Sequence, residues 1–293
     1  MLRRSARTAA AGVAFLIAAA VPSSVWSSAS ALVPGAGAGA RRGTGAGGAP
    51  VVIAHRGASR YAPENTLAAV DAAHHHGFLW VENDVQRTKD GQLVVMHDAT
   101  LRRTTDAAKV FPGRAPWRVG DFTAAEIARL DAGSWFGKRF AGERVPTLAD
   151  YLRRVDRNGQ RLLLELKSPE KYPGIEAQAI RELRELGWLD RAHINSRLIV
   201  QSFCVRCVRT VHELVPQVRT GILGAPDVGE LAHCARFADQ INPPVSALSS
   251  RWTASVHRLR GPHGRPLEIY AWNAAKDASA RTAVEWGVDG IIV

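Results

Sequence analysis

Short apolar runs alternate with ionisable residues between residues 51 and 105. Three short apolar runs are predicted to be strands, namely Val51–Ala54, Leu79–Val81 and Leu93–Met96. Ionisable residues follow each run, in the order His55 and Arg56, Glu82 and Asp84, and His97 and Asp98. Because the carboxyl ends of parallel strands meet at one face of a barrel, this order predicts a site at the strand ends.

Further elements are predicted along the rest of the chain. Leu67, Val70 and Ala73 recur at helical spacing after Thr66, which has N-cap chemistry, so a helix is predicted to about His76. The other strand-like runs are Leu162–Leu166, Leu198–Phe203, Val218–Leu223, Ala238–Ile241, Glu268–Trp272 and Gly290–Val293. About 245 residues remain after residue 50, which is the usual size of an α/β (β/α)8 barrel of the TIM type.

Nine strand-like runs compete for eight barrel positions, so one run is either an extra strand or a hairpin arm. The turn Thr88–Gly91 contains Asp90-Gly91, which favours positive φ angles and a hairpin rather than a helical crossover. The barrel is therefore expected to be irregular near its second and third strands. Residues 99–150 form a long insertion after the third strand, in which Thr123 and Glu126 have the spacing of a capping box.

The N-terminal region has the pattern of a secretory signal over residues 1–31. A basic start and the apolar run Ala9–Val21 precede the small-residue cleavage site Ala29-Ser30-Ala31. The alternative is a membrane anchor, but the apolar run is shorter than the roughly 20 residues needed to span a bilayer. Residues 32–50 are rich in Gly and Ala and are expected to be a flexible linker. We expect a secreted or extracytoplasmic protein with one domain over residues 51–293.

The composition fits one globular domain with an excess of positive charge. The chain has 293 residues, of which 46% are apolar, and a formal net charge of +11. Removal of residues 1–31 takes three arginines and no acidic residue, which lowers this charge to +8. A basic exported domain suits anionic envelope surfaces or phosphate-bearing substrates. No motif of basic residues interleaved with aromatics indicates nucleic-acid binding, and the oligomeric state is not predicted.

The cysteines and a histidine run invite metal interpretations that the spacing does not support. Cys204 and Cys207 form a C-x-x-C pair, but a second pair and a histidine at zinc-finger spacing are missing. A structural disulfide and free thiols both stay open, and with Cys234 the odd count leaves at least one thiol outside an intramolecular pair. The run His74–His76 would fan out around a helix, so its side chains cannot share one ligand.

Two pairs of side chains indicate a metal site beside acid–base chemistry. Strand residues alternate in direction, so Glu82 and Asp84 point the same way. The same rule places Glu165 and Lys167 on one face. They form either an ordinary ion pair, or Glu165 is a third metal ligand and Lys167 contacts a phosphate. Paired carboxylates flanked by histidines predict a hard divalent cation next to an acid–base pair.

The motifs HRG, PENT, ExDV, TxDG and HD occur in this order within residues 55–98. Together with LDAGSWF and VPTL in the insertion, they resemble the signature of the glycerophosphodiester phosphodiesterase family. The resemblance covers residues 51–293 and implies a barrel that hydrolyses glycerophosphodiesters to glycerol 3-phosphate and an alcohol. It also implies metal dependence and a small-molecule substrate.

The resemblance implies a role for each candidate residue. The expected ligands of one divalent cation are Glu82, Asp84 and Glu165. All-oxygen ligands suit Ca²⁺ or Mg²⁺, and export favours Ca²⁺. His55 and His97 are the expected acid and base, without an assignment of which is which. The expected substrate contacts are Arg56, Lys167, Phe203 and Trp272.

Three departures from the family pattern stand out. Cys204 replaces a common Asp, and Trp272-Asn273-Ala274-Ala275 replaces a WTVN-like run. The chain also ends at Val293, where the family continues into a final helix, so we expect either a truncated barrel or cover from another segment or partner. The alternative functions are a phospholipase C- or D-like barrel that acts on intact lipid and a non-catalytic phosphate-binding protein of the envelope.

Overall fold

The computed structural model describes residues 49–274 and 277–293. The predicted signal peptide, residues 1–31, and the predicted linker as far as residue 48 lie outside the described residues. Residues Gly45–Val293 form one compact unit. Among the described residues, no helix has both the length and the apolar character to cross a membrane.

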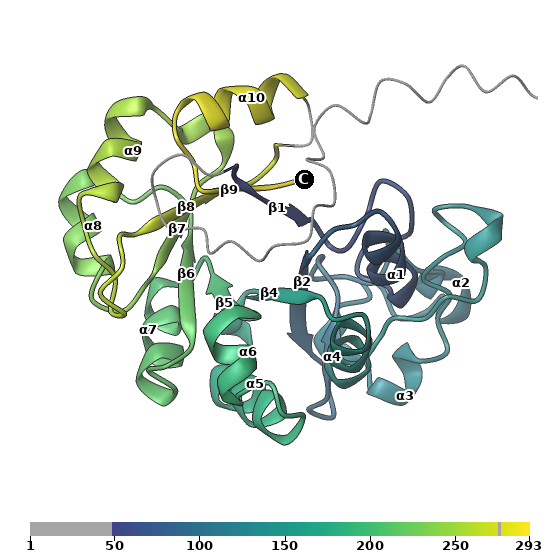
Figure 1. The fold of residues 1–293 in the computed structure, drawn as a ribbon. Helices are drawn as coiled ribbons and strands as arrows, with labels where there is room; N and C mark the ends of the chain where they lie inside the picture. Colours follow the sequence, from purple (N-terminus) through teal and green to yellow (C-terminus); the bar gives the residue numbers. More distant parts are fainter. Residues whose placement is uncertain (1–48, 275–276) are drawn as a thin grey trace, which may run out of the picture. The chain divides into compact units, whose positions relative to one another are not determined.

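Within this described part, eight parallel strands close into a barrel with helices around it (Figure 1). The strand order is β1-β9-β8-β7-β6-β5-β4-β2, and pairing of β2 with β1 closes the circle. The barrel strands are β1 (Val51–Ala54), β2 (Trp80–Arg87), β4 (Arg161–Leu166), β5 (Leu198–Ser202), β6 (Arg219–Leu223), β7 (Gln240–Asn242), β8 (Glu268–Ala271) and β9 (Gly290–Ile292). The predicted (β/α)8 fold is confirmed.

Helices join successive strands, and most begin at a capping side chain. Those outside the insertion are α1 (Leu67–His75), α4 (Leu148–Arg157), α5 (Ile175–Glu185), α6 (Arg191–Ser196), α7 (Val205–Leu214), α8 (Val228–Cys234), α9 (Ser250–His257) and α10 (Asp277–Glu285). Single 3-10 turns are η4 (Pro169–Lys171) and η5 (Val245–Ala247). Thr66 accepts a hydrogen bond from the Ala69 amide at 3.2 Å, which confirms the predicted N-cap of α1.

The ninth strand-like run is a hairpin arm outside the barrel. Strand β3 (Leu93–Val95) runs antiparallel to β2, with Val85 opposite Val95, and a single bridge joins its Val94 to Thr147. The predicted turn at residues 88–91 is confirmed, but Gly91 alone takes a positive φ, 87°, so the expectation of a second positive φ at Asp90 was wrong. The pairing with β3 and β4 extends β2 well beyond the predicted run.

The insertion after β3 has its own small core. It carries α2 (Ala107–Val110), η2 (Val119–Asp121), α3 (Ala124–Ile127) and η3 (Lys138–Phe140). Its buried apolar residues include Leu101, Phe122 and Leu130. Thr123 and Glu126 form the predicted capping box at the start of α3. In Figure 1 the insertion lies beyond α1 and α4.

The barrel interior has an apolar layer beneath a polar one. Inward side chains from six strands make the apolar layer, namely Ile53, Trp80, Leu163, Ile199, Tyr270 and Ile292. Gly290 leaves room for the Tyr270 ring, because a Cβ at residue 290 would lie 2.8 Å from a ring carbon. Along β2 and β4, the next inward residues beyond Trp80 and Leu163 are carboxylates.

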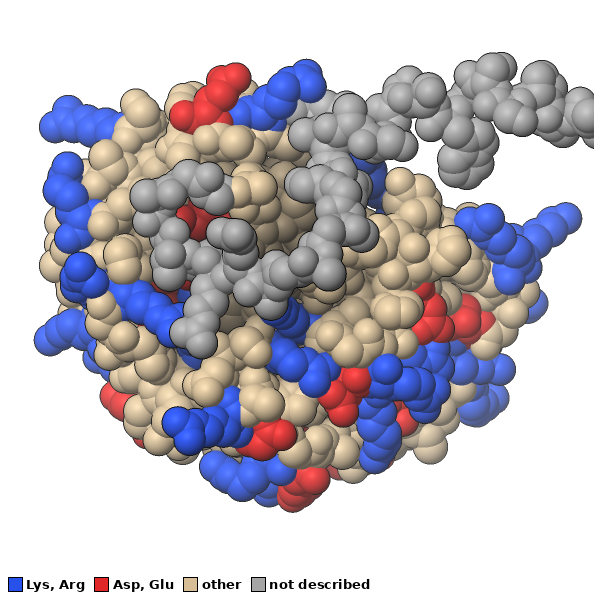
Figure 2. Space-filling view, viewed as in Figure 1, with Lys and Arg blue, Asp and Glu red and all other residues tan. Residues whose placement is uncertain are grey.

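Charged side chains are spread over the face of the molecule shown in Figure 2. On the face shown in Figure 2, Lys and Arg side chains lie around most of the outline, with Asp and Glu side chains between them. The excess of positive charge in the sequence therefore does not mark a binding surface by itself.

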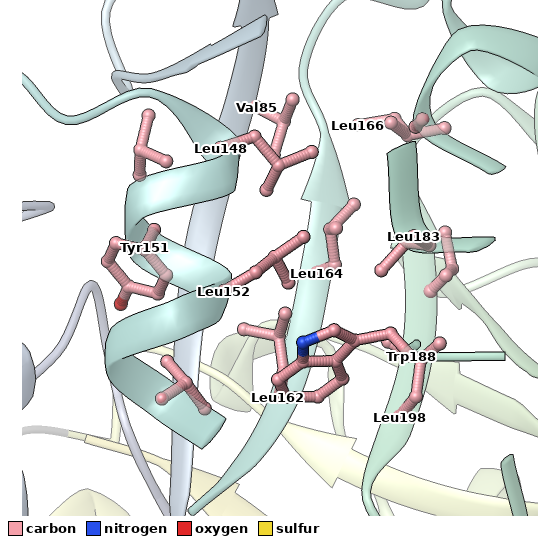
Figure 3. Packing of buried hydrophobic residues seen from close by; sticks show 14 of the residues in the cluster. Val85, Leu148, Tyr151, Leu152, Leu162, Leu164, Leu166, Leu183, Trp188 and Leu198 are labelled. Atoms are coloured by element: carbon pink, nitrogen blue, oxygen red, sulfur yellow. The ribbon is translucent and has the colours of Figure 1, made fainter. Parts of the chain in front are cut away.

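Between the strands and the helices lies the larger apolar core. Figure 3 shows Leu148 and Leu152 of α4 directed toward β2 and β4, where they meet Val85 and Leu164. These four side chains are fully buried. The α4 contact therefore holds the two strands that carry the carboxylates.

We predict that Leu152→Ala lowers the free energy of unfolding by about 2–5 kcal/mol, because the substitution opens a cavity in a fully packed site. The matched control is Leu79→Ala at a side chain that is 63% exposed, where the expected change is within about 0.5 kcal/mol. Urea denaturation measures both values. Equal effects of the two substitutions would contradict the assignment of this core.

Candidate active site

Three carboxylates meet inside the barrel at the carboxyl end of β2 and β4. Glu82 and Asp84 lie on β2, and Glu165 lies opposite Asp84 in the β2–β4 register. Each offers an oxygen, and these oxygens lie within 4.8 Å of one another. All three side chains are buried. The structure therefore brings together the three residues predicted as metal ligands.

Burial and mutual repulsion perturb these carboxylates strongly. Burial, with repulsion from Asp84 and Glu165, raises the pKa of Glu82 well above its usual range. Burial and the neighbouring Asp84 raise the pKa of Glu165 to about 8. Burial also acts to raise the pKa of Asp84, but the attraction of Lys167, His97 and Arg56 outweighs it and lowers that pKa.

The cluster fits a divalent cation. Glu82 Oε1 is buried and has no hydrogen-bond partner among the described residues. Asp84 Oδ1 and Glu165 Oε1 also lack hydrogen bonds, although the Lys167 ammonium lies 3.5 and 2.8 Å from them. Lys167 and Arg56 are two cations beside three carboxyl groups, and oxygen ligands are those that Ca²⁺ and Mg²⁺ prefer.

Asn65 orients the central ligand. Its side-chain amide donates to Asp84 Oδ2 at 2.7 Å, and its carbonyl oxygen accepts from the Asp84 amide at 3.4 Å. Asn65 takes a positive φ of 59°, which Asn tolerates better than most residues. The sequence reasoning placed Asn65 only at a helix start, and its position in the PENT motif was the signal available.

The loop after β1 aims a guanidinium at the cluster. The Arg56 amide donates to Glu82 Oε2 at 2.8 Å, and Arg56 Nε lies 3.5 Å from Asp84 Oδ2. Gly57 permits this tight turn, since its φ is 74° and a Cβ there would lie 2.7 Å from the Ala69 Cβ. The HRG motif thus has a structural reason for its glycine.

Two histidines flank the cluster from different loops. His55 Nε2 lies 4.0 Å from Glu82 Oε2, and burial with the charge of Arg56 lowers the pKa of His55 to about 4. His55 is therefore neutral at pH 7 and can accept a proton. His97 Nδ1 lies 2.7 Å from Asp98 Oδ1, so a carboxylate orients the second ring.

A chain of ion pairs joins the two histidine loops. Arg103 donates to Asp98 at 2.7 and 2.8 Å and to Glu64 at 2.8 and 2.7 Å. Glu64 also accepts from Arg56 at 2.9 Å. These bidentate contacts fix the planar guanidinium of Arg103 between the loops. The sequence reasoning assigned no role to Glu64, Asp98 or Arg103, since only the fold brings their loops together.

Three of the four predicted substrate contacts, Lys167, Phe203 and Trp272, lie next to one another. Phe203 follows β5 and meets Trp272, which follows β8, edge to face with ring centres 5.7 Å apart. The Lys167 ammonium lies 5.7 Å from the centre of the Phe203 ring. Phe203 is 53% exposed, so its ring is available to a ligand. The structure thus brings these three residues together beside the carboxylates.

Cys204 and Cys207 form a disulfide at the start of α7, directly after Phe203. The sequence left this pairing open. Cys234 is a buried free thiol. Within the described residues, the carboxylate trio is the cluster with metal-binding geometry, and the exposed His74–His76 run is not part of it.

Comparisons with known proteins find glycerophosphodiester phosphodiesterases among the relatives of this chain. The model of the Glycerophosphoryl diester phosphodiesterase family matches residues 55–293. A Bacillus subtilis glycerophosphodiester phosphodiesterase is 34% identical over 255 residues, which is 82% of this chain and 82% of the relative. The corresponding enzyme of Caldanaerobacter subterraneus is 34% identical, with 83% of this chain and 93% of the relative covered. An Oleispira antarctica phosphodiesterase, solved with the product sn-glycerol 3-phosphate, matches with a TM-score of 0.70 and 28% identity over 83% of this chain and 92% of that one.

We predict that metal binding releases a proton. Burial and mutual repulsion raise the pKa of Glu82 well above its usual range and that of Glu165 to about 8, so a cation must displace protons from the metal-free trio. Affinity for Ca²⁺ should therefore rise as pH increases through about pH 8. Calorimetry from pH 6 to pH 9, in buffers that differ in ionisation enthalpy, measures both affinity and proton release.

Glu165→Gln should lower this affinity by roughly 10–100-fold or more, because one charged ligand is lost. Glu170→Gln, at an exposed carboxylate nearby, removes the same charge and serves as the control with little expected change. Affinity that is independent of pH, or equal losses in the two variants, would contradict the assignment of the trio.

Proposed function

The chain belongs to the Glycerophosphoryl diester phosphodiesterase family, and from this premise we propose that it hydrolyses glycerophosphodiesters to sn-glycerol 3-phosphate and an alcohol. One observation carries the proposal. The buried trio of Glu82, Asp84 and Glu165 lies beside Arg56 and two histidine loops at the carboxyl end of the barrel. The product bound to the Oleispira antarctica relative supports the same reaction.

Glu82, Asp84 and Glu165 would hold one divalent cation, which when bound supplies positive charge that stabilises the transition state of phosphodiester cleavage. We favour Ca²⁺ over Mg²⁺, because residues 1–31 have the features of a secretory signal and point to an extracytoplasmic site of action.

Arg56 and Lys167 would bind the phosphate. Their charged groups approach the trio from the loops after β1 and β4. Arg56 Nε lies 3.5 Å from Asp84 Oδ2, and Lys167 Nζ lies 3.5 Å from Asp84 Oδ1, so both cations face the same carboxylate. Arg56 brings a planar fork that matches two phosphate oxygens, while Lys167 acts as a point charge. Phe203 and Trp272 would contact the organic part of the substrate.

The two histidines would move the protons. His55 is neutral at pH 7 and accepts the proton of the attacking hydroxyl, which belongs either to the substrate glycerol or to water. The attacking oxygen bonds to phosphorus as the bond from phosphorus to the alcohol oxygen breaks. His97, oriented by Asp98, donates a proton to the leaving alkoxide. If the glycerol hydroxyl attacks first, water then opens the cyclic phosphate.

We predict that the chain releases glycerol 3-phosphate from glycerophosphocholine, that chelation abolishes this release, and that Ca²⁺ restores it. An enzyme-coupled assay for glycerol 3-phosphate measures each step, and Mg²⁺ in a parallel sample compares the two ions. Circular dichroism confirms the fold of each sample. Folded protein that acts only on lipid vesicles would point to the lipid-directed alternative, and folded protein without activity would point to a binding protein.

His97→Ala should lower kcat by roughly 10²–10⁴-fold, because the leaving alkoxide loses its proton donor. Ca²⁺ affinity should stay near the wild-type value, since His97 is outside the ligand set. His74→Ala, at an exposed histidine on α1, is the matched control and should keep full turnover. Near wild-type kcat in the His97 variant would remove this residue from the mechanism.

A further inference from the structure

A second charged opening lies at the same end of the barrel as the carboxylate trio. It is a cleft of about 870 Å³ between the β2–β3 hairpin, the insertion and the connection from β4 to α5. Two of its lining residues come shortly after the carboxylates in the chain. Arg87 is the last residue of β2, and Tyr172 lies five residues beyond Lys167, which follows β4. None of the side chains assigned to the reaction lines it.

The cleft is basic. Its cationic lining residues are Arg87, Lys89, Arg118, Lys171 and Arg181. Arg118 has an exposed partner, Asp121, at 3.9 Å, while the other four lack a carboxylate at ion-pairing distance among the described residues. Asp90, the second acidic lining residue, is engaged by Thr88 and by the Ala124 amide. Five cations face two carboxylates in the lining, so the cleft carries a net positive charge.

Hydrogen bonds hold the walls of the cleft in place. Arg87 donates to the Pro173 carbonyl at 3.1 Å, and its guanidinium lies 5.9 Å from the centre of the Tyr172 ring. Gln178 of α5 donates to the Gly91 carbonyl in the hairpin. The Arg87 guanidinium is held in position by these contacts, and its other N–H groups are available to donate to an anion.

One buried amide joins this cleft to the loop that carries His97. The Tyr172 hydroxyl donates to Gln86 Oε1 at 3.0 Å. Gln86 Nε2 in turn donates to the carbonyls of Met96, His97 and Asp98 at 2.7, 3.3 and 2.8 Å. The wall of the cleft and the backbone of the His97 loop are thus held by the same side chain.

We propose that this cleft is a second anion subsite, which takes a phosphate group carried on the alcohol part of an extended glycerophosphodiester. The inference rests on the proposed function and narrows its substrate class. A phosphate monoester carries close to two negative charges at pH 7, which match the net positive charge of the cleft. The enzyme would then favour substrates whose alcohol bears a further phosphate over substrates with an uncharged alcohol.

The test compares two substrates that differ by one phosphate, glycerophosphoglycerol and glycerophosphoglycerol phosphate. The Ca²⁺-loaded wild-type chain should show roughly tenfold higher kcat/KM for the phosphorylated substrate at low salt, and less at high salt. The double variant Lys171→Gln with Arg181→Gln should lose most of this preference through KM. The control double variant Arg157→Gln with Arg184→Gln removes the same charge from exposed positions outside the cleft and should keep the preference.

Turnover of both substrates without preference would overturn this proposal and leave the proposed function intact. Equal loss of preference in the two double variants would also overturn it, because a general charge effect would then suffice. Inorganic phosphate that changes turnover of glycerophosphoglycerol only when Lys171 and Arg181 are present would reassign the cleft to free phosphate and overturn the extended substrate. Absence of turnover on both substrates, from folded protein, would overturn the proposed function together with the subsite.

Discussion

Three carboxylates lie together inside the barrel, and their mutual repulsion determines what the residues around them must do. Glu82, Asp84 and Glu165 lie within 4.8 Å of one another, and burial removes the water that would otherwise screen them. Lys167 and Arg56 supply part of the compensating charge. Glu82 Oε1 and Asp84 Oδ1 lack hydrogen bonds, which is the state expected of ligands arranged for a cation.

The scaffold explains how such a cluster persists. The register between β2 and β4 sets Asp84 opposite Glu165. Both strands are held in place by the apolar layer inside the barrel and by the core between the strands and α4. Loops from β1 and β3 then meet above the cluster through the ion pairs of Arg103 with Glu64 and Asp98. These ion pairs fix the positions of the two histidine loops, and catalysis depends on such precise placement of the reacting groups.

The order of strands and helices along the sequence predicted the barrel, and strand alternation predicted that Glu82 and Asp84 share a face, because both patterns are local properties of the chain. The ligand role of Glu165 and the acid–base roles of His55 and His97 came from the resemblance to the family. The sequence did not predict the roles of Asn65 or Arg103, because their partners Asp84 and Glu64 lie 19 and 39 residues away and only the fold brings them into contact. The Cys204–Cys207 pairing stayed open, since C-x-x-C spacing alone allows both a disulfide and free thiols. The basic cleft combines three separate segments and has no signature in any one of them.

Crystals soaked with Mn²⁺, measured near the manganese absorption edge, test the cation site most directly. An ion held by the trio should give one anomalous peak at about 2.0–2.6 Å from oxygens of Glu82, Asp84 and Glu165, with Arg56 and Lys167 facing it. A peak elsewhere, or no peak within ligand distance of at least two of these carboxylates, would contradict the claim that their repulsion is arranged for a divalent cation.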